Sequence, residues 1–211
     1  MPRKKMILKS RTLVLVEGKD EVNFLSKLLE NLGFKAQVED ICGKDLFPTE
    51  NGFAAIKQLE GFENVKSLAV IRDADYGENA VKRAFQSVKT VLERNGVASP
   101  SAPGEFIEND GLKIGIYIMP DCENEGMLED LCLKSVENDS VFKCANQFLD
   151  CVNASVHKNE KPKNLSKAKA QTFLAGKKEV ANATGVGAQK GYWNFEHECM
   201  NKIKQFLENL R

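Results

Sequence analysis

The stretch Thr12-Leu-Val-Leu-Val-Glu-Gly-Lys-Asp-Glu21 decides the fold of this chain. Its apolar run at positions 13–16 is typical of a β-strand that is covered on both faces. Gly18 then turns the chain, and a helix begins at about Asp20. Apolar residues recur every three or four positions along this helix until Gly33, where it ends. The stretch therefore predicts a strand, a tight turn and an amphipathic helix.

Two later strands also end in acids. Residues 67–75 read Ser-Leu-Ala-Val-Ile-Arg-Asp-Ala-Asp, and residues 113–121 read Lys-Ile-Gly-Ile-Tyr-Ile-Met-Pro-Asp. Because ligands of open α/β sheets bind beyond the carboxyl ends of the strands, acids at these positions favour one shared site. We expect four acids that follow the strands to meet at one sheet edge: Glu17, Asp73, Asp75 and Asp121.

The order of the remaining patterns predicts the fold class. Strands at 34–41 and 68–71, helices at 50–59 and 78–95, and a hairpin of 105–108 with 113–119 alternate along the chain. This order is typical of an α/β fold with a mostly parallel sheet flanked by helices. Beyond residue 121 we expect helices at 127–135, 140–152, 165–174 and 195–210, with a loop at 185–191. We predict a core domain of residues 1–135 and a C-terminal helical extension of residues 136–211 packed on it.

Converging carboxylates are costly unless something compensates their charge. Two of them about 4 Å apart repel by about 4 kcal/mol at an effective dielectric constant of about 20. Such a cluster therefore either keeps protons or binds cations, and Mg²⁺ accepts carboxylate and water ligands. Glu21, in the first turn of its helix, can join the cluster. The alternative is that each acid is an ordinary turn or helix-cap residue.

Charge is unevenly distributed along the chain, although the formal net charge is zero. Residues 1–11 and 157–178 are rich in basic side chains, whereas residues 105–139 are mainly acidic. This distribution excludes a uniformly basic nucleic-acid binder but suits a metal site with phosphate-binding surroundings. Solvated helix faces would give the same pattern.

The cysteines and the apolar segments point to an intracellular protein. The six cysteines form no zinc-type spacing, so we expect reduced thiols, with Cys144 and Cys151 in the core of an apolar helix. No apolar run reaches the roughly 20 residues of a membrane span, and the first residues lack a signal-peptide core. We expect a cytoplasmic location. The aromatic residues 192, 193 and 195 favour helix docking over base stacking.

The acidic motifs also resemble a known family. Val16-Glu17-Gly18 together with Asp73-x-Asp75 resembles the Toprim domain of topoisomerases, primases and several nucleases. The spacing Glu17-x-x-x-Glu21 and the segment Gly-Met-Leu-Glu-Asp-Leu at 126–131 look like the Toprim half of the overcoming-lysogenization-defect nucleases. Small standalone Toprim-like proteins of prokaryotes, a largely uncharacterised group, are similar over most of the chain.

The resemblance implies roles for individual residues. It makes Glu17 both a metal ligand and a general base, and Lys169 or Lys167 the residue that stabilises phosphate charge in the transition state. It implies the following ligands for one or two Mg²⁺ or Mn²⁺ ions: Glu17, Glu21, Asp73, Asp75, Glu129 and Asp130, with Asp121 as a neighbour.

The expected function is metal-dependent hydrolysis of phosphodiester bonds in DNA or RNA, with two ions positioning the attacking and leaving oxygens. The chain has no G-x-x-x-x-G-K-[ST] loop, so any ATPase activity must come from a separate partner chain. The alternatives are a non-catalytic Toprim-fold subunit that binds an ATPase or nucleic acid, and a primase-like nucleotidyl transferase. Self-association of the chain is also left open.

Overall fold

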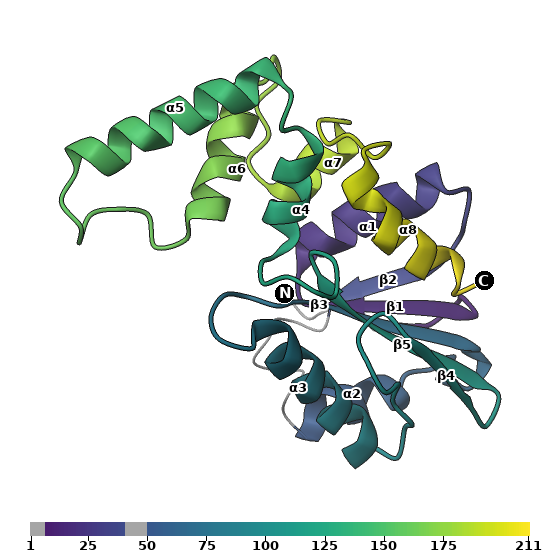
Figure 1. The fold of residues 1–211 in the computed structure, drawn as a ribbon. Coiled ribbons are helices and arrows are strands. Elements are labelled where there is room, and N and C mark those ends of the chain that lie inside the picture. The colour runs from purple at the N-terminus through teal and green to yellow at the C-terminus, as the bar shows by residue number, and fades with distance from the viewer. Residues whose placement is uncertain (1–6, 41–49) are drawn as a thin grey trace, which may run out of the picture.

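The computed structural model describes residues 7–40 and 50–211, which form one mixed α/β fold (Figure 1). The turn predicted at residues 42–45 lies outside these ranges. The strands are β1 (Thr12–Val16), β2 (Gln37–Asp40), β3 (Ser67–Asp73), β4 (Phe106–Asn109) and β5 (Leu112–Met119). The α-helices are α1 (Lys19–Asn31), α2 (Glu50–Lys57), α3 (Ala80–Arg94), α4 (Leu128–Ser135), α5 (Ser140–Ser155), α6 (Leu165–Ala175), α7 (Thr184–Gln189) and α8 (Asn201–Glu208). Short 3₁₀ turns cover Phe62–Asn64 and Glu198–Met200.

The described strands form a five-stranded sheet in the order β2-β1-β3-β5-β4. Neighbours are parallel except β4, which pairs antiparallel with β5. Asp110 and Gly111 join these two strands with φ values of 52° and 73°, as a type I′ hairpin turn requires. The predicted α/β class, the mostly parallel sheet and the hairpin are therefore confirmed, and the arrangement is consistent with a Toprim-like fold.

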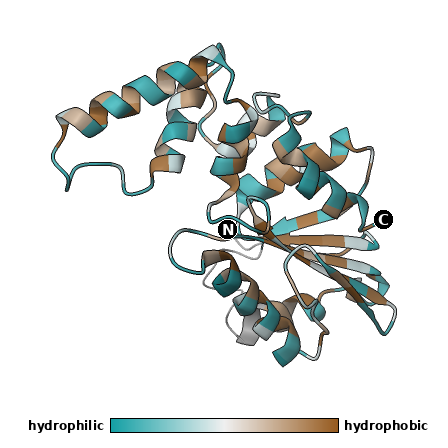
Figure 2. Cartoon of the chain, viewed as in Figure 1, coloured by the Kyte–Doolittle hydropathy of each residue, from teal (hydrophilic) through white to brown (hydrophobic). Residues whose placement is uncertain are grey.

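Helices cover both faces of the sheet, because alternate side chains of each strand point to opposite sides. Val14 and Val16 lie in one core with α1, α4 and α8. Leu13 and Leu15 lie in the other core with α2 and α3. Figure 2 shows the strands as the most continuously hydrophobic part of the chain. The first core also takes side chains from beyond residue 135, so it extends across the predicted domain boundary.

The strand order reverses at β1. The chain leaves β1 through α1 to reach β2 on one side, and later returns through β3 on the other side. The carboxyl ends of β1 and β3 are therefore adjacent at the topological switch point, where open α/β sheets bind their ligands.

Helices α5 and α6 form an arm, residues 140–175, that projects from the body of the molecule (Figure 1). Only Ala145 and Leu149 of α5 are buried. Cys144 and Cys151, which we expected in the core, are exposed, so that prediction is wrong. The segment is helical as predicted, but α6 packs on only one narrow face of α5, so the two cysteines remain exposed.

The predicted loop at 185–191 is wrong as well, because most of it is helix α7. A Cβ on Gly185 would lie 2.6 Å from the backbone oxygen of Asp20, and one on Gly187 would lie 2.7 Å from Leu174. The glycines are therefore explained by close helix packing rather than by a turn.

The C-terminal helix begins later than the predicted residue 195. His197 is not helical; its Nδ1 accepts a hydrogen bond from the Cys199 amide and so caps the 3₁₀ turn before α8. The five cysteines in the described residues are free thiols. In the same part of the chain, no helix has both the length and the apolar character needed to cross a membrane.

Candidate metal centre

Asp73 is the central acid at the sheet edge. It is the last residue of β3, only 8% exposed, and its Oδ1 accepts a 3.0 Å hydrogen bond from the Leu128 amide at the start of α4. Burial raises the pKa of Asp73 well above its usual range, and the charges of Glu21, Glu17 and Glu129 raise it further. The Leu128 amide opposes this shift without cancelling it. Four acids, from β3, α1, α4 and the turn after β1, thus share one electrostatic environment.

Glu21 and Glu129 face this centre from the first turns of α1 and α4. Burial raises the pKa of each, and the charge on Lys167 lowers both values. Glu129 Oε1 also lies 3.4 Å from the hydroxyl of Thr184, which donates to it from α7. Gly18 has no side chain, and a Cβ there would meet Glu21 Oε2 at 3.2 Å. We call Glu17, Glu21, Asp73 and Glu129 the carboxylate cluster.

Glu17 already has a cationic neighbour. Its Oε1 lies 2.9 Å from Arg72 Nε, although the pair lacks the angle of a hydrogen bond, and both side chains are about 15% exposed. Arg72 Nη1 also donates to Ser87 Oγ of α3 at 2.6 Å. Sequence reasoning missed Arg72; a lone arginine before Asp73 in an otherwise apolar strand was the available signal.

Asp75 lies in the turn after β3, with φ at 60°. Its backbone oxygen accepts a 2.9 Å hydrogen bond from the Gly126 amide, and the amide of Gly77 donates to Glu125 Oε2 at 2.7 Å. This pairing fixes the turn against the loop before α4. The assignment of Asp75 as a metal ligand stays a prediction.

Asp130 is occupied by contacts within the protein. Its Oδ2 accepts from the Met127 amide at 2.9 Å and from the Tyr76 hydroxyl at 2.6 Å, while its Oδ1 accepts from Ser166 at 2.5 Å. Burial and the bond to Asp130 raise the pKa of Tyr76, so the phenol remains a donor. Gly126 is required here, because its φ is 141° and a Cβ would lie 2.9 Å from Asp130. Asp130 therefore links the turn after β3, α4 and the arm.

Asp121 is engaged in its own loop. Its carboxylate accepts from the amides of Glu123 and Asn124 and from the Asn124 side chain, at 2.7–3.1 Å. Burial alone would raise its pKa, but these hydrogen bonds and the charge of Lys202 hold the pKa below its usual range. The structure accounts for Asp121 as a loop cap beside α8.

The two candidate lysines differ in their surroundings. Lys167 is exposed and acts electrostatically on both Glu21 and Glu129. Lys169 lies two residues further along α6, with its Nζ 5.8 Å from the ring centre of Phe142 on α5. Of the two, Lys167 is the residue that the structure brings to the cluster.

Contacts that the sequence did not predict hold the helices around the carboxylate cluster in place. Asp20 Oδ1 accepts a 2.9 Å hydrogen bond from the Gly185 amide, which ties α1 to α7. Trp193 Nε1 donates to the Thr184 oxygen at 2.9 Å, and its ring stacks on Phe173. Trp193 is thus buried, as expected for helix docking, and it helps to fix Thr184 beside Glu129.

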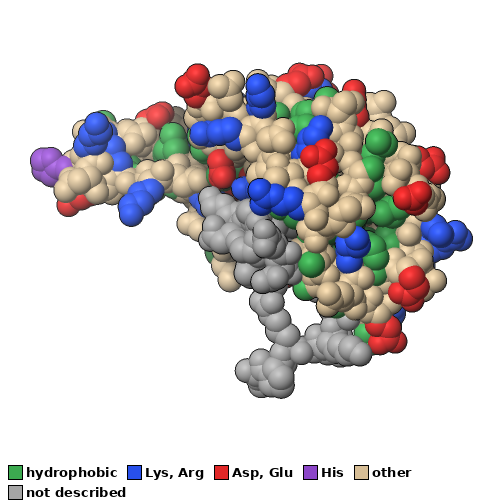
Figure 3. All heavy atoms as spheres, turned by 90° about the horizontal axis from the view of Figure 1, so that it is seen from below, with side chains coloured by type: hydrophobic (Ala, Val, Ile, Leu, Met, Phe, Trp, Pro, Cys, Tyr) green, Lys and Arg blue, Asp and Glu red, His purple; other side chains and the backbone are tan. Residues whose placement is uncertain are grey.

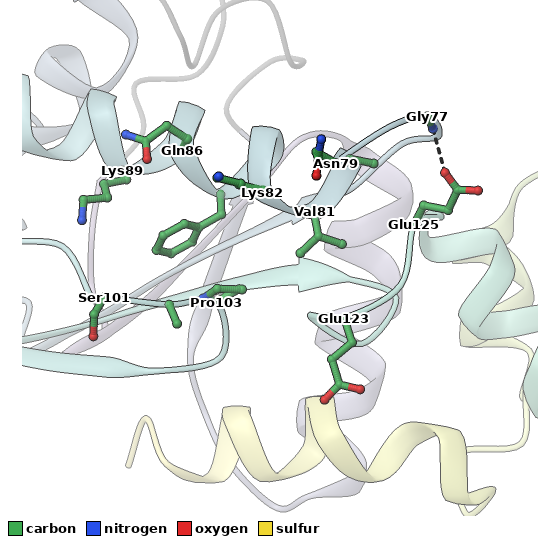
Figure 4. Close-up of a pocket in the computed structure, with 13 residues that line it drawn as sticks. Gly77, Asn79, Val81, Lys82, Gln86, Lys89, Ser101, Pro103, Glu123 and Glu125 are labelled. Atoms are coloured by element: carbon green, nitrogen blue, oxygen red, sulfur yellow. Dashed lines mark hydrogen bonds between the residues drawn. The ribbon is translucent and has the colours of Figure 1, made fainter.

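A groove of about 580 Å³ begins beside the turn after β3. Helix α3 forms one wall with Lys82, Gln86 and Lys89, and Ser101 and Pro103 lie across from it (Figure 4). The groove leads from the sheet edge along the surface of α3.

The carboxylate cluster fits a divalent cation by donor chemistry, since hard cations take carboxylate oxygens and would offset the mutual repulsion. The side chains of the cluster are not already arranged around a position where one ion could bind. Within residues 7–40 and 50–211, no three Asp, Glu, His or Cys side chains are arranged closely enough to hold a metal ion. Binding would therefore require side chains of the cluster to reorient.

The sequence of the chain matches one family model over most of its length. A family model with the description "Protein of unknown function (DUF3226)" matches residues 11–211. The chain belongs to the DUF3226 family. No functionally curated protein matches this DUF3226 chain. The matched region contains the whole carboxylate cluster, so the cluster lies within the family domain.

Solved structures of one other protein are similar to this DUF3226 chain. They are structures of the C-terminal region of the Xanthomonas campestris pv. campestris OLD protein. The form phased with mercury is 14% identical, with a TM-score of 0.48, and the match covers 96% of this chain and 97% of that one. The form phased with iodine is 15% identical, with the same TM-score and 96% coverage of each chain.

Proposed function

We propose that this DUF3226 protein is a Toprim-type nuclease that hydrolyses phosphodiester bonds with Mg²⁺ or Mn²⁺. The observation that carries the proposal is Asp73, a buried acid surrounded by three others at the switch point of a parallel sheet. Keeping such a charge cluster is unfavourable for folding, and a bound cation would offset its repulsion.

The proposed roles follow from the positions of the side chains. Asp73, Glu21 and Glu129 would hold the metal, and Glu17 would join them by exchanging its contact with Arg72. A bound divalent ion supplies charge stabilisation and a more acidic water at the phosphate. Lys167 adds a positive charge beside a strongly negative centre and so favours the approach of a phosphate.

The substrate would be nucleic acid, DNA or RNA. Lys82 and Lys89 line the groove that begins at the turn after β3, and they could hold backbone phosphates on either side of the reacting one. The chain's resemblance to Toprim nucleases also favours a separate ATPase chain as a partner that controls access to the site.

The test is cleavage of plasmid DNA and of labelled RNA by the purified full chain with Mn²⁺, compared with EDTA. Asp73→Asn should reduce cleavage at least 100-fold, whereas Glu63→Gln, an exposed acid before the start of β3 and so at the other end of the strand from Asp73, should have no effect. The proposal is wrong if the protein neither cleaves any nucleic acid with Mn²⁺ nor binds Mn²⁺ in calorimetry.

A second candidate is a non-catalytic subunit that binds nucleic acid or an ATPase chain. The contact of Arg72 with Glu17 favours it, because an internal cation already offsets part of the cluster's charge. A Glu17→Gln, Asp75→Asn double variant would then keep full affinity for its partner, in EDTA as well as in Mn²⁺. A nuclease would instead lose its Mn²⁺-dependent activity in this variant.

A further inference from the structure

Three side chains beside the carboxylate cluster form a closed ring of hydrogen bonds, which we call the Asp130 ring. Tyr76 Oη donates to Asp130 Oδ2 at 2.6 Å, and Ser166 Oγ donates to Asp130 Oδ1 at 2.5 Å. The two hydroxyl oxygens form the third contact, at 2.7 Å. The members come from the turn after β3, from α4 and from α6, and the two nearest in sequence are 36 residues apart. The ring therefore joins three distant segments at a single point.

The Asp130 ring is not part of the hydrophobic core. Tyr76 is 44% exposed, and Ser166 is half-buried. Hydrogen bonds near the surface replace bonds to water, so they add little to the free energy of unfolding. Three short contacts among the same three side chains do, however, restrict where each segment lies. The ring is therefore better explained by the positions that it fixes than by stability.

Each member of the Asp130 ring is adjacent in sequence to a residue predicted for the site: Tyr76 to Asp75, Asp130 to Glu129, and Ser166 to Lys167. Two of these neighbours are held by other means. The backbone of Asp75 pairs with Gly126, and Glu129 lies within the first turn of α4. Lys167 belongs to the arm instead, so its distance from the cluster depends on how α6 is held.

The position of Lys167 in α6 is unfavourable for the helix itself. Lys167 is the third residue of α6, and the first turn contains no acid. A cation at this end meets the partial positive charge of the helix N-terminus. The charge of Lys167 acts instead on Glu21 and Glu129. Nearby carboxylates therefore account for a lysine here, and the stability of α6 does not.

The start of α6 rests on the start of α4 at the base of the arm (Figure 1). Asn164 caps α6 by accepting from the Lys167 amide at 2.9 Å, and its Nδ2 lies 3.4 Å from Met127 Sδ at the cap of α4. The Asp130 ring adds the turn after β3 to this junction. Loss of a hydroxyl from the ring would therefore free the start of α6 to shift.

We propose that Tyr76 and Ser166 are positioning residues, whose hydroxyls hold Lys167 beside the carboxylate cluster through their shared contact with Asp130. Neither hydroxyl needs to touch the substrate, because both act through the place of α6. The role of Lys167 rests on the proposed function, whereas the placement of α6 by the ring does not depend on it.

Amide hydrogen exchange tests the placement without any need for activity. In the full chain, Tyr76→Phe should speed exchange at residues 165–168 about fivefold, as expected for the loss of one hydrogen bond, and leave α5 unchanged. Tyr192→Phe is the matched control, since it removes a hydroxyl that donates to the Glu179 oxygen at 2.7 Å, and it should leave residues 165–168 unchanged. Unchanged exchange in Tyr76→Phe overturns the proposal, whether or not the protein cleaves nucleic acid.

Kinetics with Mn²⁺ test the effect on the reaction. Tyr76→Phe and Ser166→Ala should each lower kcat about tenfold, because a displaced lysine stabilises less of the charge that develops in the transition state. KM and the Kd of Mn²⁺ should change less than about twofold, since the metal ligands stay in place. Ser166→Thr keeps a hydroxyl and should restore the rate. If the protein shows no cleavage, the proposed function fails, and hydrogen exchange alone decides the placement.

A double-variant cycle with Lys167 separates positioning from general loosening. Lys167→Met alone should lower kcat about 100-fold. Adding Tyr76→Phe to Lys167→Met should lower it less than about twofold further, because no lysine is left to place. The same tenfold loss from Tyr76→Phe with and without Lys167 would show that Tyr76 does not act through Lys167, and would overturn the proposal.

Discussion

At the scale of single residues, Asp73 and Arg72 show how neighbouring positions of one strand take opposite roles. Successive side chains of β3 point to opposite faces. Asp73 therefore faces α4, where Leu128 donates to it, whereas Arg72 reaches Glu17 and Ser87 on the α3 side. Asp73 adds negative charge to the carboxylate cluster, and Arg72 offsets part of the charge of Glu17.

Replacing Asp73 by Asn should stabilise the protein without metal. The amide keeps the acceptor for Leu128 and removes the repulsion by three acids, so we expect a gain of about 1–2 kcal/mol in the free energy of unfolding. Urea denaturation in EDTA measures this gain, and calorimetry should show loss of Mn²⁺ binding. Asp121→Asn should behave oppositely and lose about 1 kcal/mol, because that carboxylate is favourably hydrogen-bonded. If Asp73→Asn instead destabilises the protein, the negative charge of Asp73 is already offset by other groups in the folded state.

Replacing Arg72 by Met should be strongly destabilising. It leaves Glu17 in a mostly buried position beside other acids, and removing one partner of such a pair costs about 3–5 kcal/mol. Mn²⁺ should restore part of this loss if a cation can take the place of the guanidinium. Lys27→Met breaks a surface pair with Glu30 and should cost under about 1 kcal/mol with or without Mn²⁺. An equal loss of stability in Mn²⁺ and in EDTA would show that a metal ion does not take the place of the Arg72 guanidinium.

At the scale of elements, the beginnings of helices build the site. Helix α1 contributes Glu21, α4 contributes Glu129 and α7 contributes Thr184, each from its first turn. Helix N-termini favour nearby negative charge, which lets acids gather at this edge. The arm is tied to the same edge by the contact of Ser166 with Asp130.

Replacing Asp130 by Ala should loosen α4 and α6 together. The change removes the cap of α4 and the contacts with Tyr76 and Ser166, so we expect a loss of about 1–2 kcal/mol. Amide hydrogen exchange should become faster in both helices. Asp139→Ala, which removes the corresponding cap from α5, should accelerate exchange in α5 but not in α4. Unchanged exchange in α6 would mean that Asp130 does not hold the arm.

At the scale of the whole molecule, basic and acidic side chains are intermixed on the face that Figure 3 draws. Figure 3 shows basic side chains on the arm and on the body, interspersed with acidic ones. Part of the basic segment 157–178 is engaged internally, since Lys177 pairs with Asp139 at 2.6 Å and lies over Phe173. Lys167 of the same segment is exposed, and its charge acts on Glu21 and Glu129.

The carboxylate cluster should make stability depend on pH and on metal. The pKa values of Asp73, Glu21 and Glu129 are raised in the folded state, so this state holds protons that the unfolded chain has already lost. Their contribution to the free energy of unfolding is therefore greatest below about pH 4 and falls as the pH rises through the folded values. Excess Mn²⁺ should reverse this trend, by about 2.7 kcal/mol at a hundredfold excess over its Kd.

Melting temperatures between pH 5 and 8, in EDTA and in Mn²⁺, measure this linkage. The difference between the two series should widen with pH in the unmodified chain and nearly vanish in Asp73→Asn. A difference that is absent at every pH would count against a metal site.

The sequence by itself determined the α/β class, the parallel strands and the acids at their ends. Apolar runs and acidic turn residues are local patterns, and they can be recognised without knowing how the chain packs. Glu17 and Asp73 were predicted from these patterns, with Glu21 as an acid that can join them, whereas Glu129 was implied by the family resemblance. All four share one environment in the structure.

Only the tertiary structure decided which acids share that environment and what surrounds them. Asp130 and Asp121 match the same motifs but accept internal hydrogen bonds, and Arg72 reaches Glu17 from the neighbouring strand. The exposure of Cys144 and the helix at residues 184–189 were also decided by packing. The physical reason is that burial and charge compensation depend on side chains distant in sequence, which a local pattern does not contain.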